Sequence, residues 1–241
     1  MLLSAVFMIA LLQSSLAFQA PRRSSTLLSM VVSSYDLGVR SSSSRASNTL
    51  LDPLVVCGPS GVGKGTIIQR FMESHQGQQF GFTVSHTTRA PRQGEVDGIH
   101  YHFVDETKMR REIAEGKFLE YAQVHGNWYG TSWASLQDLG KRALLDIDVQ
   151  GVRNIKGMEE AGVLEPKYIF IAPPSLETLR TRLQGRQSES PESLERRLGN
   201  AASEVEYGLE AGNFDAIVTN DDLDQAVQDF AQAVRALYQE W

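Results

Sequence analysis

The chain has 241 residues, of which 41% are apolar, and this is enough for one large α/β domain with a buried core. Its formal net charge of −6 is uneven, because residues 1–50 carry four arginines and one acid while residues 51–241 carry the other 19 basic and 28 acidic side chains. An acidic body argues against a protein that coats nucleic acid, and the single cysteine, Cys57, excludes an internal disulfide.

The first fifty residues have the composition of a targeting leader. Residues 1–17 hold a short apolar run followed by small residues, which is typical of a secretory signal and is shorter than the roughly twenty residues of a membrane span. Residues 18–50 contain ten serines, four arginines and one acid, as transit peptides do, and are too poor in large apolar groups to fold alone. We therefore expect residues 1–50 to be a disordered, removable leader.

The junction SLAFQAP at residues 15–21 resembles the signal-plus-transit junction of plastid proteins in algae with complex plastids, where a phenylalanine follows the signal cleavage site. This resemblance implies import into the plastid through a bipartite leader. Simple secretion, the mitochondrion and the cytosol are the alternatives. We expect no membrane association of the mature form.

Four short apolar runs in the body have the length of buried parallel strands, at residues 54–57, 143–149, 168–172 and 215–219. Between or after them, apolar residues recur at helical spacing in residues 66–72, 175–183 and 222–241. Strands that alternate with helices predict an α/β fold with three layers, in which helices cover both faces of a parallel sheet.

Two segments interrupt this alternation. Residues 80–131 contain β-rich runs at 81–86, 100–104 and 118–124, and one helix that Asp105 begins as N-cap and that ends near Gly116. The second segment is rich in Arg, Ser and Glu, and Ser190-Pro191 is typical of a helix start. We expect a small β-rich insertion at about 83–131 and a helical lid at about 182–205.

The sequence GPSGVGK at residues 58–64 follows a predicted strand and precedes a predicted helix, which is the context of a phosphate-binding P-loop. Glycines let the backbone N–H groups point at phosphate oxygens, and the helix N-terminus and a lysine add positive charge. The expected ATP-binding residues here are Gly58, Pro59, Ser60, Gly61, Val62, Gly63, Lys64, Gly65 and Thr66. Many such loops place Ser or Thr after the lysine to bind Mg²⁺, whereas Gly65 stands here, so no side-chain metal ligand is assigned and Thr66 is the candidate.

Seven further motifs occur in order: SHTTRAPRQGE (85–95), GIHYHF (98–103), FLEYA (118–122), YGT (129–131), LDIDVQG (145–151), IAPPS (171–175) and VTNDD (218–222). Together with the P-loop they closely resemble the guanylate kinases over residues 51–241. The resemblance implies a P-loop sheet with a GMP-binding insertion and a lid. It also implies transfer of the terminal phosphate of ATP to GMP, with Mg²⁺ held on phosphates and waters.

The resemblance also implies roles for individual residues. Those matched to the GMP phosphate site are Ser85, Arg89, Arg92, Tyr101 and Tyr129. Those matched to guanine recognition are Glu120, Thr131 and Asp148, with Asp146 beside them. The lid arginines are Arg182, Arg186 and Arg197, which with Lys64 and Arg89 form the expected catalytic set. Asn220 lies in the segment that borders the adenine of ATP.

The chemistry of these residue types agrees with the resemblance. Arginine meets phosphate through two parallel hydrogen bonds, and carboxylates such as Glu120 and Asp148 accept from guanine N1–H and N2–H, which adenine cannot satisfy. The expected partners are ATP and GMP, with dGMP as a further acceptor, and no nucleic acid; the expected assembly is a monomer or a weak homodimer. The alternatives are a non-catalytic guanylate-kinase-like binding module and a kinase for AMP or UMP.

Overall fold

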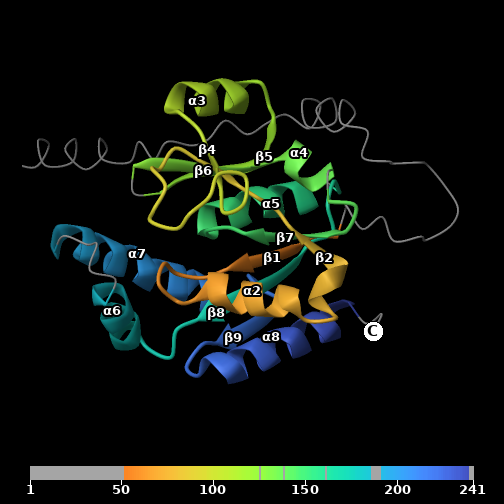
Figure 1. Cartoon of the computed structure of the whole chain (residues 1–241). Coiled ribbons are helices and arrows are strands. Elements are labelled where there is room, and N and C mark those ends of the chain that lie inside the picture. Colours follow the sequence, from red (N-terminus) through yellow and green to blue (C-terminus); the bar gives the residue numbers. More distant parts are fainter. Residues whose placement is uncertain (1–51, 125, 138, 161, 186–190, 239–241) are drawn as a thin grey trace, which may run out of the picture. The chain divides into compact units, whose positions relative to one another are not determined.

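The computed structural model describes residues 52–124, 126–137, 139–160, 162–185 and 191–238. The expected leader at residues 1–50, Arg186 and Ser190 lie outside the described residues. The described part is an α/β protein with two sheets and helices between and around them (Figure 1). The predicted fold class is confirmed.

The main sheet has five parallel strands. In spatial order they are β2 (Phe80–Phe82), β7 (Arg142–Asp146), β1 (Leu54–Cys57), β8 (Lys167–Ala172) and β9 (Ala216–Thr219). Val56 of β1 lies opposite Asp146 of β7, so these two strands end side by side. Ligands of open parallel sheets bind at this carboxyl edge, which places the loop after β1 and the residues after β7 next to each other.

Three helices pack on one face of the main sheet and share its largest core cluster. They are α2 (Lys64–Glu73), α6 (Leu176–Gln184) and α8 (Leu223–Tyr238). The rings of Phe71 in α2 and Phe230 in α8 meet edge to face with centroids 5.1 Å apart. This packing fixes the helix that follows the phosphate loop against the C-terminal helix.

The opposite face is covered by α5 (Val149–Glu160) and by the C-terminal part of α7 (Pro191–Leu209) (Figure 1). A Cβ atom at Gly208 would lie 2.2 Å from the ring of Phe170 in β8, so the backbone of α7 touches this ring and only glycine fits. The sheet thus has helices on both sides, as a buried parallel sheet requires.

The second sheet follows β2 in the chain and has four strands. Their order is β4 (His102–Phe103), β3 (His86–Thr87), β6 (Asn127–Ser132) and β5 (Phe118–Val124). Helix α3 (Glu106–Ala114) begins after Asp105, whose side chain accepts from the Lys108 N–H, as predicted; α4 (Trp133–Gln137) follows β6. Helix α5 lies between the two sheets in Figure 1.

The predicted β run at residues 81–86 is wrong as one strand. Residues Phe80–Phe82 pair in parallel with β7 and form the edge of the main sheet, whereas His86–Thr87 belong to the second sheet. A chain that leaves one sheet and enters the next keeps an extended backbone, so composition alone does not show the break. The run at 100–104 is also shorter in the structure, since β4 is His102–Phe103.

The predicted strand at residues 143–149 is too long. Strand β7 ends at Asp146, and α5, which was not predicted, begins at Val149. The Asp148 Oδ1 atom accepts a hydrogen bond from the Gly151 N–H at 2.9 Å, which is the geometry of a helix N-cap. A continuous apolar run does not show where a strand ends and a helix begins.

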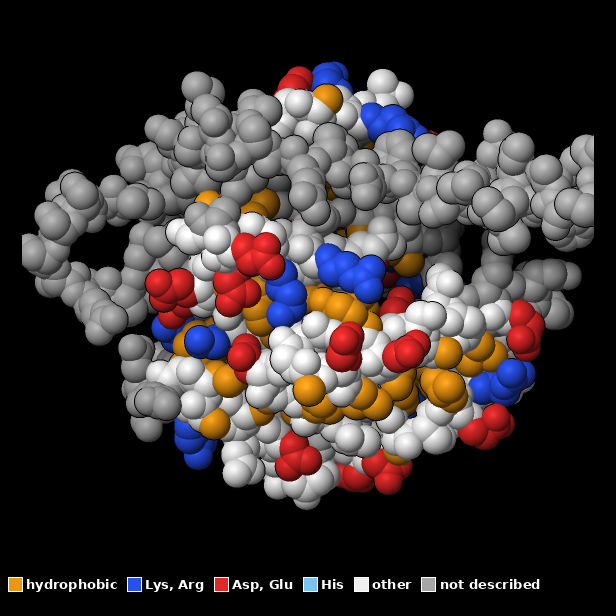
Figure 2. Space-filling model, turned by 180° about the vertical axis from the view of Figure 1, so that it is seen from behind, with side chains coloured by type: hydrophobic (Ala, Val, Ile, Leu, Met, Phe, Trp, Pro, Cys, Tyr) orange, Lys and Arg blue, Asp and Glu red, His pale blue; other side chains and the backbone are white. Residues whose placement is uncertain are grey.

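Charged side chains are mixed on the surface of the described residues. Figure 2 shows the side opposite to Figure 1, where Asp and Glu stand among Lys and Arg and apolar atoms lie between them. On this side the cations form no continuous patch. None of the described helices combines the length and the apolar character needed to span a membrane.

Candidate nucleotide site

Two cavities of about 200 and 210 Å³ adjoin the phosphate loop, residues 58–64. The first cavity is lined by most of the predicted site residues: Gly58, Ser60, Lys64, Ser85, Arg89, Arg92, Tyr101, Glu120, Tyr129, Asp146, Asp148 and Arg197. The second is lined by Gly61, Val62, Gly63, Thr66, Arg182 and Asn220. Residues that are far apart in sequence therefore meet at the carboxyl edge of the main sheet.

Three of the predicted residues line neither cavity, and a fourth lies outside the described residues. Pro59 lies within the loop, where its carbonyl accepts from the Val62 N–H at 3.2 Å, and Gly65 is exposed in the first turn of α2. Thr131 lies behind the first cavity, where its hydroxyl is 3.1 Å from that of Ser85. Arg186 is outside the described residues.

The phosphate loop leaves the start of α2 open to a ligand. Gly63 stands at the N-cap with φ +100°, a left-handed conformation that favours glycine, and it makes no side-chain cap. The first turn of α2 also has no acidic residue. The N–H groups of this turn and the positive end of the helix dipole are therefore available to an anion.

Lys64 lies at the border between the loop and the acidic edge of the sheet. Its Nζ atom donates to the Gly58 carbonyl at 2.6 Å and is 3.9 Å from Asp146 Oδ1. The side chain is partly buried, with 17% of its surface exposed. A single cation thus faces the first cavity from the loop, at the position where P-loop lysines reach the phosphates of a nucleotide.

Asn220 and Arg182 join the second cavity to the loop. The Asn220 side chain donates to the Val62 carbonyl at 2.7 Å, and Arg182 donates to the Asn220 carbonyl at 2.9 Å. A Cβ atom at Gly63 would lie 2.5 Å from the Asn220 amide nitrogen. The segment after β9 is therefore packed directly on the phosphate loop.

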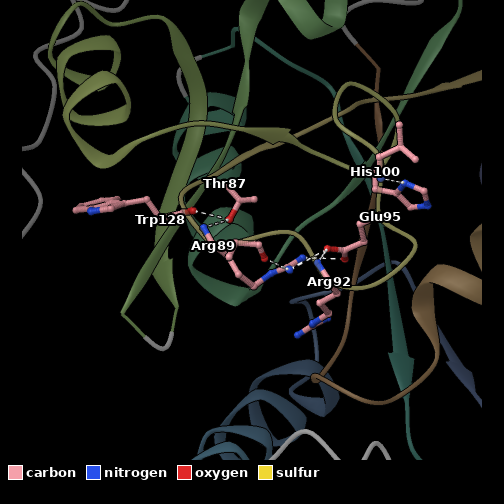
Figure 3. A network of polar contacts seen from close by, with 8 residues as sticks. Thr87, Arg89, Arg92, Glu95, His100 and Trp128 are labelled. Carbon is pink, nitrogen blue, oxygen red and sulfur yellow. Dashed lines mark hydrogen bonds and ion pairs between the residues drawn. The ribbon is translucent and has the colours of Figure 1, made fainter.

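Arg89 is held by a network in the loop that follows β3 (Figure 3). Its guanidinium donates to both carboxylate oxygens of Glu95 at 2.9 Å and to the Ala90 carbonyl at 2.7 Å. Three of its five N–H donors are thus used. The Glu95 carboxylate also accepts from the Arg92 backbone N–H at 2.6 Å, while the Arg92 side chain points away from it in Figure 3.

The Arg89 guanidinium also lies 5.4 Å from the centre of the Tyr101 ring, within the range of a cation–π contact. Both Arg89 and Glu95 are mostly buried, with 14% and 16% of their side chains exposed. Hydrogen bonds from Arg89 hold the pKa of Glu95 below its ordinary value, so the pair is ionised at neutral pH. Glu95 was not predicted as a site residue, although it lies inside the 85–95 motif.

In the GMP site that the sequence resemblance implies, replacing Glu95 by glutamine should raise the KM for GMP roughly tenfold, because a buried charged hydrogen bond contributes about 1.5–3 kcal/mol and its loss frees the Arg89 side chain. The KM for ATP should stay unchanged. The matched control is Glu106→Gln, which breaks the exposed ion pair with Arg110 on α3. Equal GMP KM values in the two variants, measured in steady state, would show that Glu95 does not position Arg89.

Glu120 is a buried carboxylate at the top of the first cavity. Its Oε1 atom accepts from the Thr131 N–H at 2.8 Å, and 4% of the residue is exposed. Burial raises the pKa of Glu120 to about 7, and nearby Asp148 adds to the shift. Burial also raises the pKa of Asp146 and of Asp148, against the opposing charge of Lys64.

Gly151 supports Glu120 from helix α5. A Cβ atom at Gly151 would lie 2.8 Å from the Glu120 Oε2 atom and 3.1 Å from Ile147. The exchange Gly151→Ala should therefore displace the carboxylate. In the GMP site that the sequence resemblance implies, it should raise the KM for GMP about five- to hundredfold, since overpacking costs about 1–3 kcal/mol. Gly157→Ala is the control. Gly157 lies on the same helix, and a Cβ atom there meets nothing within 4 Å. The measurement is the steady-state KM for GMP, and equal values in the two variants would refute this role of Gly151.

The first cavity also contains a residue that sequence reasoning missed. Glu204 of α7 lines the cavity together with Arg197, seven residues before it on the same helix. An i, i+7 spacing places both on one helix face, and this signal was present in the sequence. The packing of α7 against the rest of the protein decides which of its faces points at the phosphate loop, and no local sequence pattern shows this packing.

A family model for guanylate kinase matches residues 51–237. Over 175 residues the chain is 51% identical to "Guanylate kinase 1" of Oryza sativa, which covers 71% of this chain and 44% of the rice protein. It is 49% identical to the guanylate kinase of Schizosaccharomyces pombe over 73% of this chain and 86% of the yeast protein. The crystal structure of guanylate kinase from Anaplasma phagocytophilum superposes with a TM-score of 0.60 at 32% identity, covering 77% of this chain and 85% of that one.

The chain spans about half the length of the plant relatives that it matches, and most of the length of the yeast protein. The family model covers the phosphate loop, both sheets and nearly all of α8. All the cavity-lining residues named above fall inside the matched range. The chain belongs to the guanylate kinase family.

Proposed function

We propose that this protein transfers the terminal phosphate of ATP to GMP and so produces ADP and GDP. The observation that carries the proposal is that Lys64 of the phosphate loop and Arg89 and Arg92 of the loop after β3 line one cavity. Two polyanions have to meet for such a transfer, and their mutual repulsion has to be offset by cations from both sides. A cavity shared by these three side chains supplies this arrangement.

Each substrate has its own part of the site in this proposal. The N–H groups of the loop and Lys64 bind the phosphates of ATP, and the segment around Asn220 borders its adenine. Arg89, Arg92, Tyr101 and Tyr129 bind the phosphate of GMP, with Ser85 beside them. Catalysis is then mostly alignment and charge stabilisation, because phosphoryl transfer spreads charge over the oxygens of the moving group.

Guanine is selected by carboxylates in this scheme. Glu120 and Asp148 accept from the two N–H groups of the guanine edge, and Thr131 and Asp146 complete this part of the site. Sites that read base edges through hydrogen bonds discriminate strongly, because a wrong base leaves a buried polar group without a partner. AMP and UMP are therefore poor acceptors, and dGMP, which differs only at the ribose, is accepted.

The proposed cofactor is Mg²⁺, which neutralises the charge that develops on the phosphate oxygens. The oxygen-rich lining of the first cavity fits a hard cation that arrives on ATP and keeps several waters. Among the described residues no three His, Cys, Asp or Glu side chains form a metal cluster. Thr66 lines the second cavity, whereas Lys64 lines the first, so no side-chain ligand for Mg²⁺ is assigned.

A coupled assay tests the proposal, with purified full chain, MgATP and GMP, and with AMP, UMP and dGMP in parallel. ADP formation that depends on GMP or dGMP is the expected result. The non-catalytic binding module is the alternative, and it predicts no turnover with any acceptor. Lys64 and the Arg89–Arg92 pair favour the enzyme, since a module that binds only protein needs no cation on the phosphate loop.

We also propose that residues 1–50 direct the protein to the plastid and that the mature form is a monomer or a weak homodimer. The composition of residues 1–17 and 18–50 supports this localisation. N-terminal sequencing of the mature protein and fluorescence imaging of a fusion in an alga with complex plastids test it. An intact leader on the mature protein, or a cytosolic signal, would rule it out.

A further inference from the structure

Glu204 is an acid among the groups that would bind phosphate. It lines the first cavity from α7, and the backbone N–H of Ser60 in the phosphate loop lies close to its carboxylate. In a P-loop these backbone N–H groups hold the phosphate oxygens of the nucleotide. The carboxylate therefore stands beside a donor that a bound phosphate needs, at a place where a second negative charge would arrive.

The part of α7 that carries Glu204 is fixed to the rest of the protein. Ala201, one turn before it, belongs to the core cluster and is 1% exposed. Gly208, one turn after it, lies against the ring of Phe170, where even a Cβ atom would not fit. With Ala201 buried in the core cluster and Gly208 packed against β8, this stretch of α7 holds Glu204 at the loop when a nucleotide enters.

The charged and titratable groups around Glu204 come from four elements. They are Lys64 at the start of α2, Asp146 and Asp148 at the end of β7 and just after it, Cys57 at the end of β1, and Arg197 on α7 itself. Burial raises the pKa of Glu204 to about 7, against the opposing charge of Lys64 and with the support of Asp148. Neutral and ionised forms are thus both accessible near neutral pH.

We propose that Glu204 is a proton-accepting member of the phosphate site, which takes up one proton from solvent when nucleotide phosphates enter the loop. The proton forms an O–H bond on the carboxylate, and no bond of the nucleotide changes. The neutral carboxyl group then stands beside the phosphates without repelling them and can donate a hydrogen bond to them. This inference rests on the ATP site of the proposed function and adds a proton to its binding step.

The sign of the pH dependence follows from the two protonation states. Nearby phosphates carry like charge and raise the pKa of Glu204 above its value in the free protein. Below about pH 7 the group is protonated in both states, and binding does not depend on it. Above pH 7 the free protein has to take up a proton on binding, so nucleotide affinity falls by up to tenfold for each pH unit.

Calorimetry of ADP binding to the full chain tests the proposal, at pH 8 and pH 6 in buffers of different ionisation enthalpy. Magnesium is left out so that the charge of ADP is not neutralised. The ADP phosphates are fully ionised at pH 8 and contribute no proton there. We expect an uptake approaching one proton per ADP at pH 8, measured on the wild-type protein alone. At pH 6 the ADP phosphate itself titrates, so the proton balance there is compared between the wild type and Glu204→Gln and should be the same in both.

Two variants then assign the proton. Glu204→Gln should bind ADP without proton uptake, about tenfold more tightly than the wild type at pH 8 and equally at pH 6, because one pH unit separates pH 8 from the pKa. Glu206→Gln is the control, since Glu206 is exposed on the same helix two residues further on. Its proton uptake should equal that of the wild type.

The outcomes are distinguishable. No proton uptake by the wild type at pH 8, or a release, overturns the role of Glu204 even if the glutamine variant does not fold. The same uptake at pH 8 in Glu204→Gln as in the wild type also overturns it. If the wild type does not bind ADP at either pH, the proposed function fails instead, because its phosphate loop then binds no nucleotide.

Discussion

Exchange of Lys64 for methionine should lower kcat for the ATP–GMP reaction by about 10²–10³-fold, which is the usual effect of removing one group that stabilises charge in a transition state. Methionine has nearly the length of lysine but no charge. In the structure the ammonium group is the only cation that the phosphate loop itself contributes to the first cavity, and it lies between the Gly58 carbonyl and Asp146. No described neighbour in the loop can replace it.

The matched control is Lys141→Met, which removes an exposed ammonium group outside both cavities. It should retain wild-type turnover, and the melting temperatures of both variants should stay close to that of the wild type. The KM for GMP should change little in Lys64→Met, since GMP is held by the second sheet. If Lys64→Met kept full turnover, the loop would not contribute to phosphoryl transfer, and the central claim about the first cavity would be wrong.

The local parts of the fold could be read from the sequence because their signals are contiguous. Strand β1, the glycine loop and α2 follow one another within twenty residues, and Asp105 marks the start of α3 as its N-cap. Strand β2 was misassigned because its membership in the main sheet depends on pairing with β7, about sixty residues later. No local pattern contains such a pairing, so propensity and spacing could not reveal it.

The same distinction holds for the site. The cations of the loop and of the 85–95 motif were predicted because each belongs to a recognisable motif, and the structure brings them to one cavity. Glu95 and Glu204 were missed for a different reason. A carboxylate that pairs with Arg89, or one that reaches the Ser60 N–H from α7, acts through a neighbour that only the folded chain supplies. Sequence patterns thus indicate which groups bind, but not which groups hold them in place.

Replacing Glu120 by glutamine should reduce kcat/KM for GMP by roughly 10–10²-fold and leave ADP binding intact. Guanine loses one of its two charged acceptors, and a hydrogen bond to a charged group contributes about 1.5–3 kcal/mol. The Thr131 N–H can still donate to the glutamine oxygen, so the fold of β5 and β6 should not change. Steady-state kinetics with GMP and calorimetry with ADP separate the two effects, and an unchanged kcat/KM would refute the assignment of Glu120 to guanine.

The pH dependence of Glu120 should be opposite to that of Glu204, although burial raises both pKa values to about 7. Guanine N–H groups stabilise the ionised carboxylate, so bound GMP lowers the pKa of Glu120, whereas phosphates raise that of Glu204. At saturating ATP, kcat/KM for GMP should therefore rise between pH 6 and 8 and level off above. In Glu120→Gln this rise should be lost, apart from the titration of the GMP phosphate near pH 6. A rise of equal size in the variant would mean that a group other than Glu120 binds guanine. Glu204 could not account for such a rise, because its proton moves in the opposite direction.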